Sequence, residues 1–127
     1  MRFGYTILYV DDVAMTLAFY GKAFALATRF LHDSGSYGEL ETGATALAFA
    51  SRTMLRELGK TPQPPVLDQP SGEIALVTAD VPAAVERAVM AGATLVQAPQ
   101  AMPWGQTIAY VGDINGFLVE LCTPMAG

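Results

Sequence analysis

Short apolar runs and amphipathic stretches follow one another along the chain, and the same order occurs twice. The segment "GYTILYVDDVAMTLAFYGKAF" begins with a β-branched apolar run, which predicts a strand, and continues with apolar side chains at helical spacing. The segment "GEIALVTADVPAAVERAVMAGA" repeats this plan without a gap, because Gly4 falls on Gly72 and Asp12 on Asp80 (72 − 4 = 68 and 80 − 12 = 68). Such a repeat indicates a duplicated supersecondary unit.

Each predicted helix has a recognisable start. Asp12 and Asp80 can accept hydrogen bonds from the free N–H groups of a first helical turn, and Pro82 suits that turn because it has no N–H to leave unpaired. Gly92 follows the second helix, where a residue with left-handed backbone is expected. The two helices are therefore predicted to begin at residues 13 and 81.

Three further strands are predicted after each helix. Residues 52–60 predict a short helix, and the proline-rich stretch 61–70 predicts an extended linker. Asn115-Gly116 predicts a two-residue hairpin turn, since both residue types tolerate positive φ. We therefore predict one α+β domain of plan βαβββ–linker–βαβββ, with module one at about 1–52, the linker at 53–71 and module two at 72–127. The six strands are expected at 26–32, 36–42, 45–51, 94–99, 106–112 and 116–122.

Composition narrows the class of protein. Of the 127 residues 52% are apolar and 15% are charged, which is enough apolar material for a packed core and argues against disorder. The net charge of −5 argues against nucleic-acid binding, which favours a basic face. One cysteine, no evident signal peptide and no apolar run of about 18 residues lead us to expect a cytoplasmic protein without membrane contact.

The chain resembles the vicinal oxygen chelate superfamily, which includes glyoxalase I, extradiol dioxygenases and bleomycin-resistance proteins. The resemblance rests on "VDDVAMTLAFYGKAF", "GEIALVTADVPAAVERAVMAGATLV" and "WGQTIAYVGDINGFLVELCTP", in that order and at duplicated spacing. It covers essentially the whole sequence. It implies two tandem βαβββ modules that form a cup-shaped, half-open eight-stranded barrel, with the ligand or metal inside, and it implies a homodimer.

The metal enzymes of this superfamily take one ligand from the first and one from the last strand of each module. In this sequence the resemblance places those positions at Tyr5, Ala48, Glu73 and Glu120. A phenol is a poor substitute for histidine at neutral pH, and an alanine offers no ligand atom. We therefore expect no metal cofactor, with Glu73 and Glu120 as the weak candidates for a divalent ion.

The two acids Glu73 and Glu120 each stand beside apolar neighbours. Because strand side chains alternate, Glu120 should face away from Val119 and Leu121, into the cup, and Glu73 should do the same. Without a metal, two neighbouring carboxylates repel, so the pKa of one should rise.

Other residues carry competing interpretations. Trp104 lies in the loop "MPWGQ" and could close over a ligand or fill the end of a sheet. His32 lies near a predicted turn and is expected to be solvated, and Glu39 and Glu41 are expected to be a solvent-facing pair. Cys122 shares the predicted face of Glu120 and is expected to be an inert buried thiol.

Two functions from different classes remain open. The first is a metal-free protein of the bleomycin-resistance type, which binds a small, aromatic molecule in an apolar cup through Tyr5, Glu73, Trp104 and Glu120. The second is a metal-dependent lyase or isomerase of the glyoxalase I type, in which Glu120 is the catalytic residue. The preserved Glu120 favours the second, and Tyr5 and Ala48 favour the first.

Overall fold

The computed structural model describes residues 1–125. The packing divides the chain into two compact units, with the division between Pro64 and Pro65, inside the stretch expected to be the linker. Within residues 1–125 no helix has both the length and the apolar character that a membrane crossing requires.

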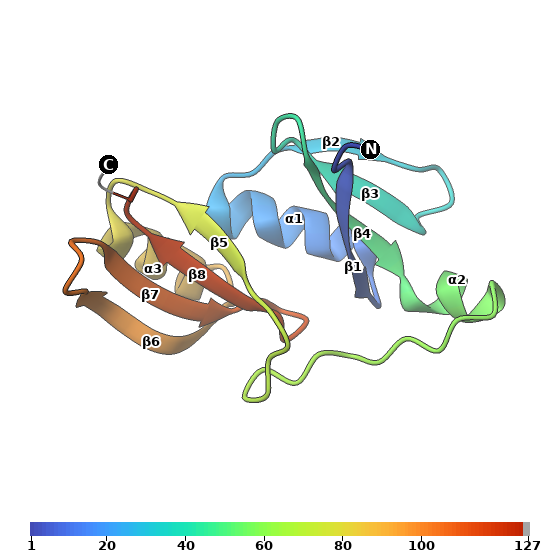
Figure 1. The fold of residues 1–127 in the computed structure, drawn as a ribbon. Helices are drawn as coiled ribbons and strands as arrows, with labels where there is room; N and C mark the ends of the chain where they lie inside the picture. The colour runs from blue at the N-terminus through green and yellow to red at the C-terminus, as the bar shows by residue number, and fades with distance from the viewer. Residues whose placement is uncertain (126–127) are drawn as a thin grey trace. The chain divides into compact units, whose positions relative to one another are not determined.

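The first unit contains a four-stranded mixed sheet and two helices (Figure 1). The strand order is β1-β4-β3-β2, with β1 parallel to β4 and the other pairs antiparallel. The elements are β1 (Tyr5–Val10), α1 (Val13–Phe24), β2 (Thr28–Leu31), β3 (Tyr37–Leu40), β4 (Ala46–Ser51) and α2 (Arg52–Glu57).

Helix α1 begins as the sequence predicts. The carboxylate of Asp12 accepts a hydrogen bond of 2.9 Å from the backbone N–H of Met15. The helix packs on one face of the sheet, where the Tyr20 ring lies 5.0 Å from the ring of Phe49. It crosses β3 at Gly38, where an added Cβ would lie 2.7 Å from Leu17 Cδ1. A glycine is needed there because the helix and the strand approach so closely.

The second unit repeats this arrangement (Figure 1). The strand order is β5-β8-β7-β6, with β5 parallel to β8. Asp80 caps α3 by accepting a hydrogen bond of 3.1 Å from the N–H of Ala83, and Pro82 lies in the first turn. The elements are β5 (Ile74–Val77), α3 (Val81–Met90), β6 (Thr94–Ala101), β7 (Thr107–Gly112) and β8 (Leu118–Cys122).

The predicted α+β class with two tandem βαβββ modules is confirmed. The left-handed backbone after the second helix is also confirmed, since Gly92 has φ of +116°. The predicted two-residue turn at Asn115-Gly116 is wrong, because only Gly116 of the two has positive φ and β8 begins at Leu118. The Asp113 carboxylate instead caps a longer loop by accepting hydrogen bonds from the N–H groups of Asn115 and Phe117, at 2.8 and 2.9 Å.

Candidate functional site

One row of polar side chains crosses the sheet of the second unit. The strand register places Glu120 of β8 beside Ala75 of β5 and Tyr110 of β7, and places Tyr110 beside Gln97 of β6. Cross-strand partners share a face of the sheet, so these side chains lie side by side. We refer to these three cross-strand neighbours as the polar row: Gln97, Tyr110 and Glu120.

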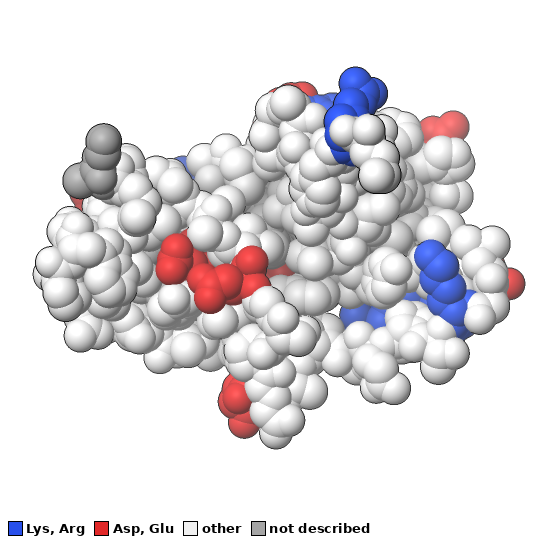
Figure 2. Space-filling view, in the orientation of Figure 1, with Lys and Arg blue, Asp and Glu red and all other residues white. Residues whose placement is uncertain are grey.

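The polar row lies on the sheet face opposite α3. Val119 and Leu121 flank Glu120 in sequence, point the other way and are almost fully buried. The Tyr110 hydroxyl donates a hydrogen bond of 3.0 Å to Glu120 Oε1. Figure 2 shows acidic side chains gathered over β5 and β8. The expectation that Glu120 faces away from its apolar neighbours therefore agrees with the register.

An apolar row runs beside the polar row on the same face. The register pairs Cys122 of β8 with Val77 of β5 and with Ile108 of β7. Cys122 and Ile108 are buried, whereas Val77 is exposed. Val77, Cys122 and Ile108 are called the apolar row. This face thus combines hydrogen-bonding groups with a hydrophobic strip, a combination that suits a planar molecule with a polar edge.

Loss of hydration and the Glu120 carboxylate raise the pKa of three neighbouring groups. Loss of hydration, the charge of Glu120 and a hydrogen bond with that residue raise the pKa of Glu73, which lies one residue before β5. Loss of hydration and the hydrogen bond to Glu120 raise the pKa of Tyr110 to about 12. Burial, with the same carboxylate, raises the pKa of the Cys122 thiol. The phenol and the thiol therefore stay protonated at neutral pH, and Cys122 is not an activated nucleophile.

Gln97 ends the polar row with an unused donor. Its side-chain Nε2 is buried and has no hydrogen-bond partner within residues 1–125. The register of β6 against β7 is irregular on both sides of Gln97, and such bulges re-aim side chains. A buried amide N–H without a partner costs about 1–3 kcal/mol, so a ligand that accepts its hydrogen bond would recover that energy.

The equivalent row of the first unit differs in chemistry. Ile7 of β1 pairs with Ala48 of β4, and Ala75 of β5 pairs with Glu120 of β8. Ile7 and Ala75 are equivalent positions of the two modules, because they are separated by the repeat offset of 68 residues (75 − 7 = 68). The register therefore makes Ala48 the counterpart of Glu120. Glu39 pairs with Ala48 and is the counterpart of Tyr110.

These residues do not fit the metal that the fold family implies. In the first unit the family's two ligand positions hold a phenol, at Tyr5, and a methyl group, at Ala48. Transition-metal sites require several N, O or S ligands, and the methyl group supplies none. Within residues 1–125 no three His, Cys, Asp or Glu side chains are grouped so that they could hold an ion.

The carboxylates of the first unit are not the solvent-facing pair that we expected. The Glu39 side chain is only 14% exposed and accepts a hydrogen bond of 2.7 Å from the Tyr37 hydroxyl. Glu41 is exposed but forms two hydrogen bonds of 2.7 Å with Arg29. The expectation was wrong for Glu39 because this carboxylate accepts a hydrogen bond from Tyr37 and forms an ion pair with Arg29. His32 is exposed in a turn, where its Nδ1 lies 2.8 Å from Ser34 Oγ.

Tyr5 and Trp104, the remaining predicted site residues, are not members of the polar row. Tyr5 begins β1 in the first unit and is 58% exposed. Trp104 lies in the β6–β7 turn of the second unit and is also 58% exposed. Its indole N–H donates to Gln106 Oε1 at 2.8 Å, and the Gln106 amide donates to the carbonyl of Thr123 at 2.8 Å. The contact of Tyr5 and Trp104 with a ligand stays a prediction.

Sequence reasoning missed Tyr110 and Gln97. Tyr110 follows from the position of Glu120 once β7 and β8 are placed in register, and "QTIAYVG" carries Tyr110 at the parity that alternation requires. The position of Gln97 could not be found in this way, because the irregular register of β6 breaks simple alternation.

Replacing Glu73 with glutamine should stabilise the protein at neutral pH and have little effect in acid. The pKa of Glu73 is higher in the folded chain than in the unfolded chain, so its favourable contribution is full below the unfolded pKa of about 4.3 and is lost as pH rises through the folded pKa. Because the side chain is exposed and screened, the gain should be at most about 1 kcal/mol.

Urea unfolding of Glu73→Gln at about pH 4 and about pH 7.5 measures this difference. Glu86→Gln, a charge-matched change on an exposed position of α3, is the control. An equal gain at both pH values, or an equal gain in the control, would show that the raised pKa of Glu73, which loss of hydration and Glu120 cause, is not the source of the effect.

Comparison with known proteins agrees with this fold. A family model described as "Glyoxalase-like domain" matches residues 3–126. A glyoxalase-related enzyme from Fulvimarina pelagi is 23% identical with a TM-score of 0.83, over 98% of this chain and 88% of that chain. A glyoxalase/bleomycin resistance protein/dioxygenase family enzyme from Burkholderia phytofirmans PsJN is 19% identical with a TM-score of 0.75, over 94% and 96% of the two chains. None of the curated proteins compared with the sequence matches it.

Proposed function

Because the chain belongs to the glyoxalase-like domain family of the vicinal oxygen chelate superfamily, we propose that it binds a small aromatic molecule without a catalytic metal. The observation that carries this proposal is the polar row beside an apolar row on the sheet face opposite α3. The polar row offers carboxylate acceptors at one end and an unpartnered amide donor at the other. This corresponds to the drug-binding or resistance type of the family rather than to its metal enzymes.

The chemistry of the row specifies the kind of ligand. Glu120 and Glu73 would attract a cationic group or an N–H donor, since charge-assisted hydrogen bonds are about twice as strong as neutral ones. Gln97 would donate to an acceptor on the same molecule. The aromatic body would lie against Val77, the exposed member of the apolar row. A planar, cationic heteroaromatic compound meets all three requirements.

A lyase or isomerase of the glyoxalase I type is the second candidate, and one observation favours it. The family resemblance assigns Glu120 to a ligand position of the superfamily's metal enzymes, and its Oε1 accepts a hydrogen bond from the Tyr110 hydroxyl. Such chemistry needs a metal to polarise a carbonyl, and Tyr5 and Ala48 provide no adequate ligands on the first unit. The binding function therefore has the stronger support.

Proflavine, a planar heteroaromatic cation, tests the proposal. The protein is first treated with EDTA, its metal content is checked by elemental analysis, and proflavine is then titrated against it. We expect saturable binding without added metal. One zinc, nickel or iron per chain in the untreated protein, together with loss of binding after EDTA, would contradict the proposal and favour the enzyme.

We also propose that the chain forms a homodimer. Each sheet has two open edges, formed by β1 and β2 in the first unit and by β5 and β6 in the second. Open edges tend to pair, and β1 carries exposed apolar side chains at Tyr5 and Ile7. Light scattering at micromolar concentration should give twice the mass of the chain, and a monomer would contradict this proposal.

A further inference from the structure

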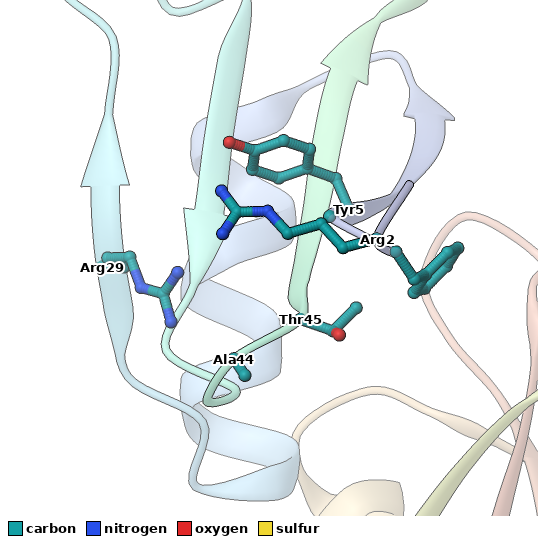
Figure 3. Close-up of a pocket in the computed structure, with 7 residues that line it drawn as sticks. Arg2, Tyr5, Arg29, Ala44 and Thr45 are labelled. Carbon is teal, nitrogen blue, oxygen red and sulfur yellow. The ribbon is translucent and has the colours of Figure 1, made fainter.

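A hollow of about 650 Å³ lies in the first unit, at the start of β1, and the polar row is no part of it. Its wall includes Arg2, Tyr5, Arg29 and Thr45. Figure 3 shows the guanidinium groups of Arg2 and Arg29 directed toward the same space, with the Tyr5 ring beside them. Two arginines that share one hollow suggest recognition of an anion, because the guanidinium fork matches carboxylate and phosphate oxygens.

Arg29 is held in place before any ligand arrives. The register of β2 against β3 shifts between Thr28 and Phe30, which leaves Arg29 at a bulge. Its Nε and Nη2 donate to the two oxygens of Glu41 at 2.7 Å each, and Nη2 also donates to the carbonyl of Gly43 at 2.7 Å. Its Nη1 has only a longer ion pair of 3.8 Å with Glu39. Arg29 is therefore rigid, and Nη1 retains hydrogen-bonding capacity for a ligand.

Arg2 is the second cationic group of the hollow. It is exposed and has no ion-pair partner among residues 1–125. Arg2 and Arg29 carry two positive charges and Glu39 and Glu41 carry two negative charges, so these four side chains balance, and Arg2 is the one without an ion-pair partner in the described part of the chain. The carboxylate of a ligand would pair with Arg2, whereas a doubly charged phosphate would also be repelled by Glu39 and Glu41.

We propose that this hollow binds a small molecule through a carboxylate group, paired with Arg2 and hydrogen-bonded by Arg29 Nη1 and the Tyr5 hydroxyl. The volume falls within the range of sites that hold a small ligand. This inference goes beyond the proposed function and does not depend on it, because every residue of the hollow belongs to the first unit.

The test is a titration of the ¹⁵N-labelled protein with benzoate, followed by the backbone resonances of Gly4, Tyr5 and Thr45 and the Nε–H of Arg29. We expect these resonances to shift together. Arg2→Gln should weaken benzoate about tenfold, as loss of one charge-assisted hydrogen bond does. Arg56→Gln, which removes an equal charge from an exposed position of α2, should leave the affinity unchanged.

Three results would overturn this inference. Neutral benzamide could bind as tightly as benzoate, which would remove the role of the charge. Inorganic phosphate could bind more tightly, which would make the site one for a dianion. The affinity of Arg2→Gln could equal that of the unmodified protein and of Arg56→Gln. Since Arg2 is exposed, its replacement is not expected to unfold the chain.

Discussion

Replacing Glu120 with glutamine should weaken the binding of proflavine by about tenfold or more. Glutamine keeps the shape of the side chain and can still accept the hydrogen bond of Tyr110, but it has no negative charge. A hydrogen bond to a charged group contributes about 1.5–3 kcal/mol, and each 1.4 kcal/mol corresponds to a factor of about ten in affinity. Glu73 retains one carboxylate on this face, so part of the affinity should survive.

Two comparisons isolate the charge of Glu120. Glu86→Gln, on an exposed position of α3 in the same unit, changes the net charge equally and should not alter binding. Acridone, a neutral planar analogue, should bind the Glu120→Gln variant nearly as well as it binds the original chain. If acridone loses as much affinity as proflavine, the variant has changed the shape of the face, and the ionic contact is refuted.

Replacing Phe49 with alanine should destabilise the first unit by about 3–5 kcal/mol. Phe49 is fully buried on β4, where its ring packs against Tyr20 of α1. Truncation removes the apolar contact and leaves a cavity that the helix and strand cannot close completely. Because native domains are stable by only about 5–15 kcal/mol, this loss is large.

Chemical denaturation measures the loss, and two probes separate the units. Trp104 is the sole tryptophan and lies in the second unit, so its fluorescence follows that unit, whereas far-UV circular dichroism follows both. Met15→Ala, on the exposed side of α1, is the control and should change stability by less than about 0.5 kcal/mol. A Phe49→Ala effect no larger than that of the control would refute the packing of α1 on the sheet.

Most of the fold could be predicted because its signals are local. The caps at Asp12 and Asp80 fix where the helices begin, and the constant offset of 68 residues shows that one plan is used twice. The family resemblance drawn from the same segments is confirmed by the glyoxalase-like match. The turn at Asn115-Gly116 was mispredicted because the nearby carboxylate of Asp113 satisfies the loop's N–H groups and stabilises a longer connection.

The candidate site could be predicted only in part, because it depends on register between strands. Alternation placed the Glu120 side chain on the face of β8 that Val119 and Leu121 do not share. The expected rise in the pKa of one carboxyl group occurs at Glu73. Tyr110 and Gln97 lie beside Glu120 only because of the pairing of β6, β7 and β8, and no local sequence pattern specifies that pairing. Arg29 likewise reaches Glu41 through a bulge, which a period of two residues does not reveal.

The most direct test of the account is an NMR titration of EDTA-treated, ¹⁵N-labelled protein with proflavine. Metal-free binding at the polar row predicts saturable shifts at the backbone resonances of Ala75, Gln97, Tyr110 and Glu120, together with the side-chain amide of Gln97, in the absence of any added metal. Shifts that appear only after zinc, nickel or iron is added, or that leave these residues unaffected, would contradict metal-free binding at the polar row.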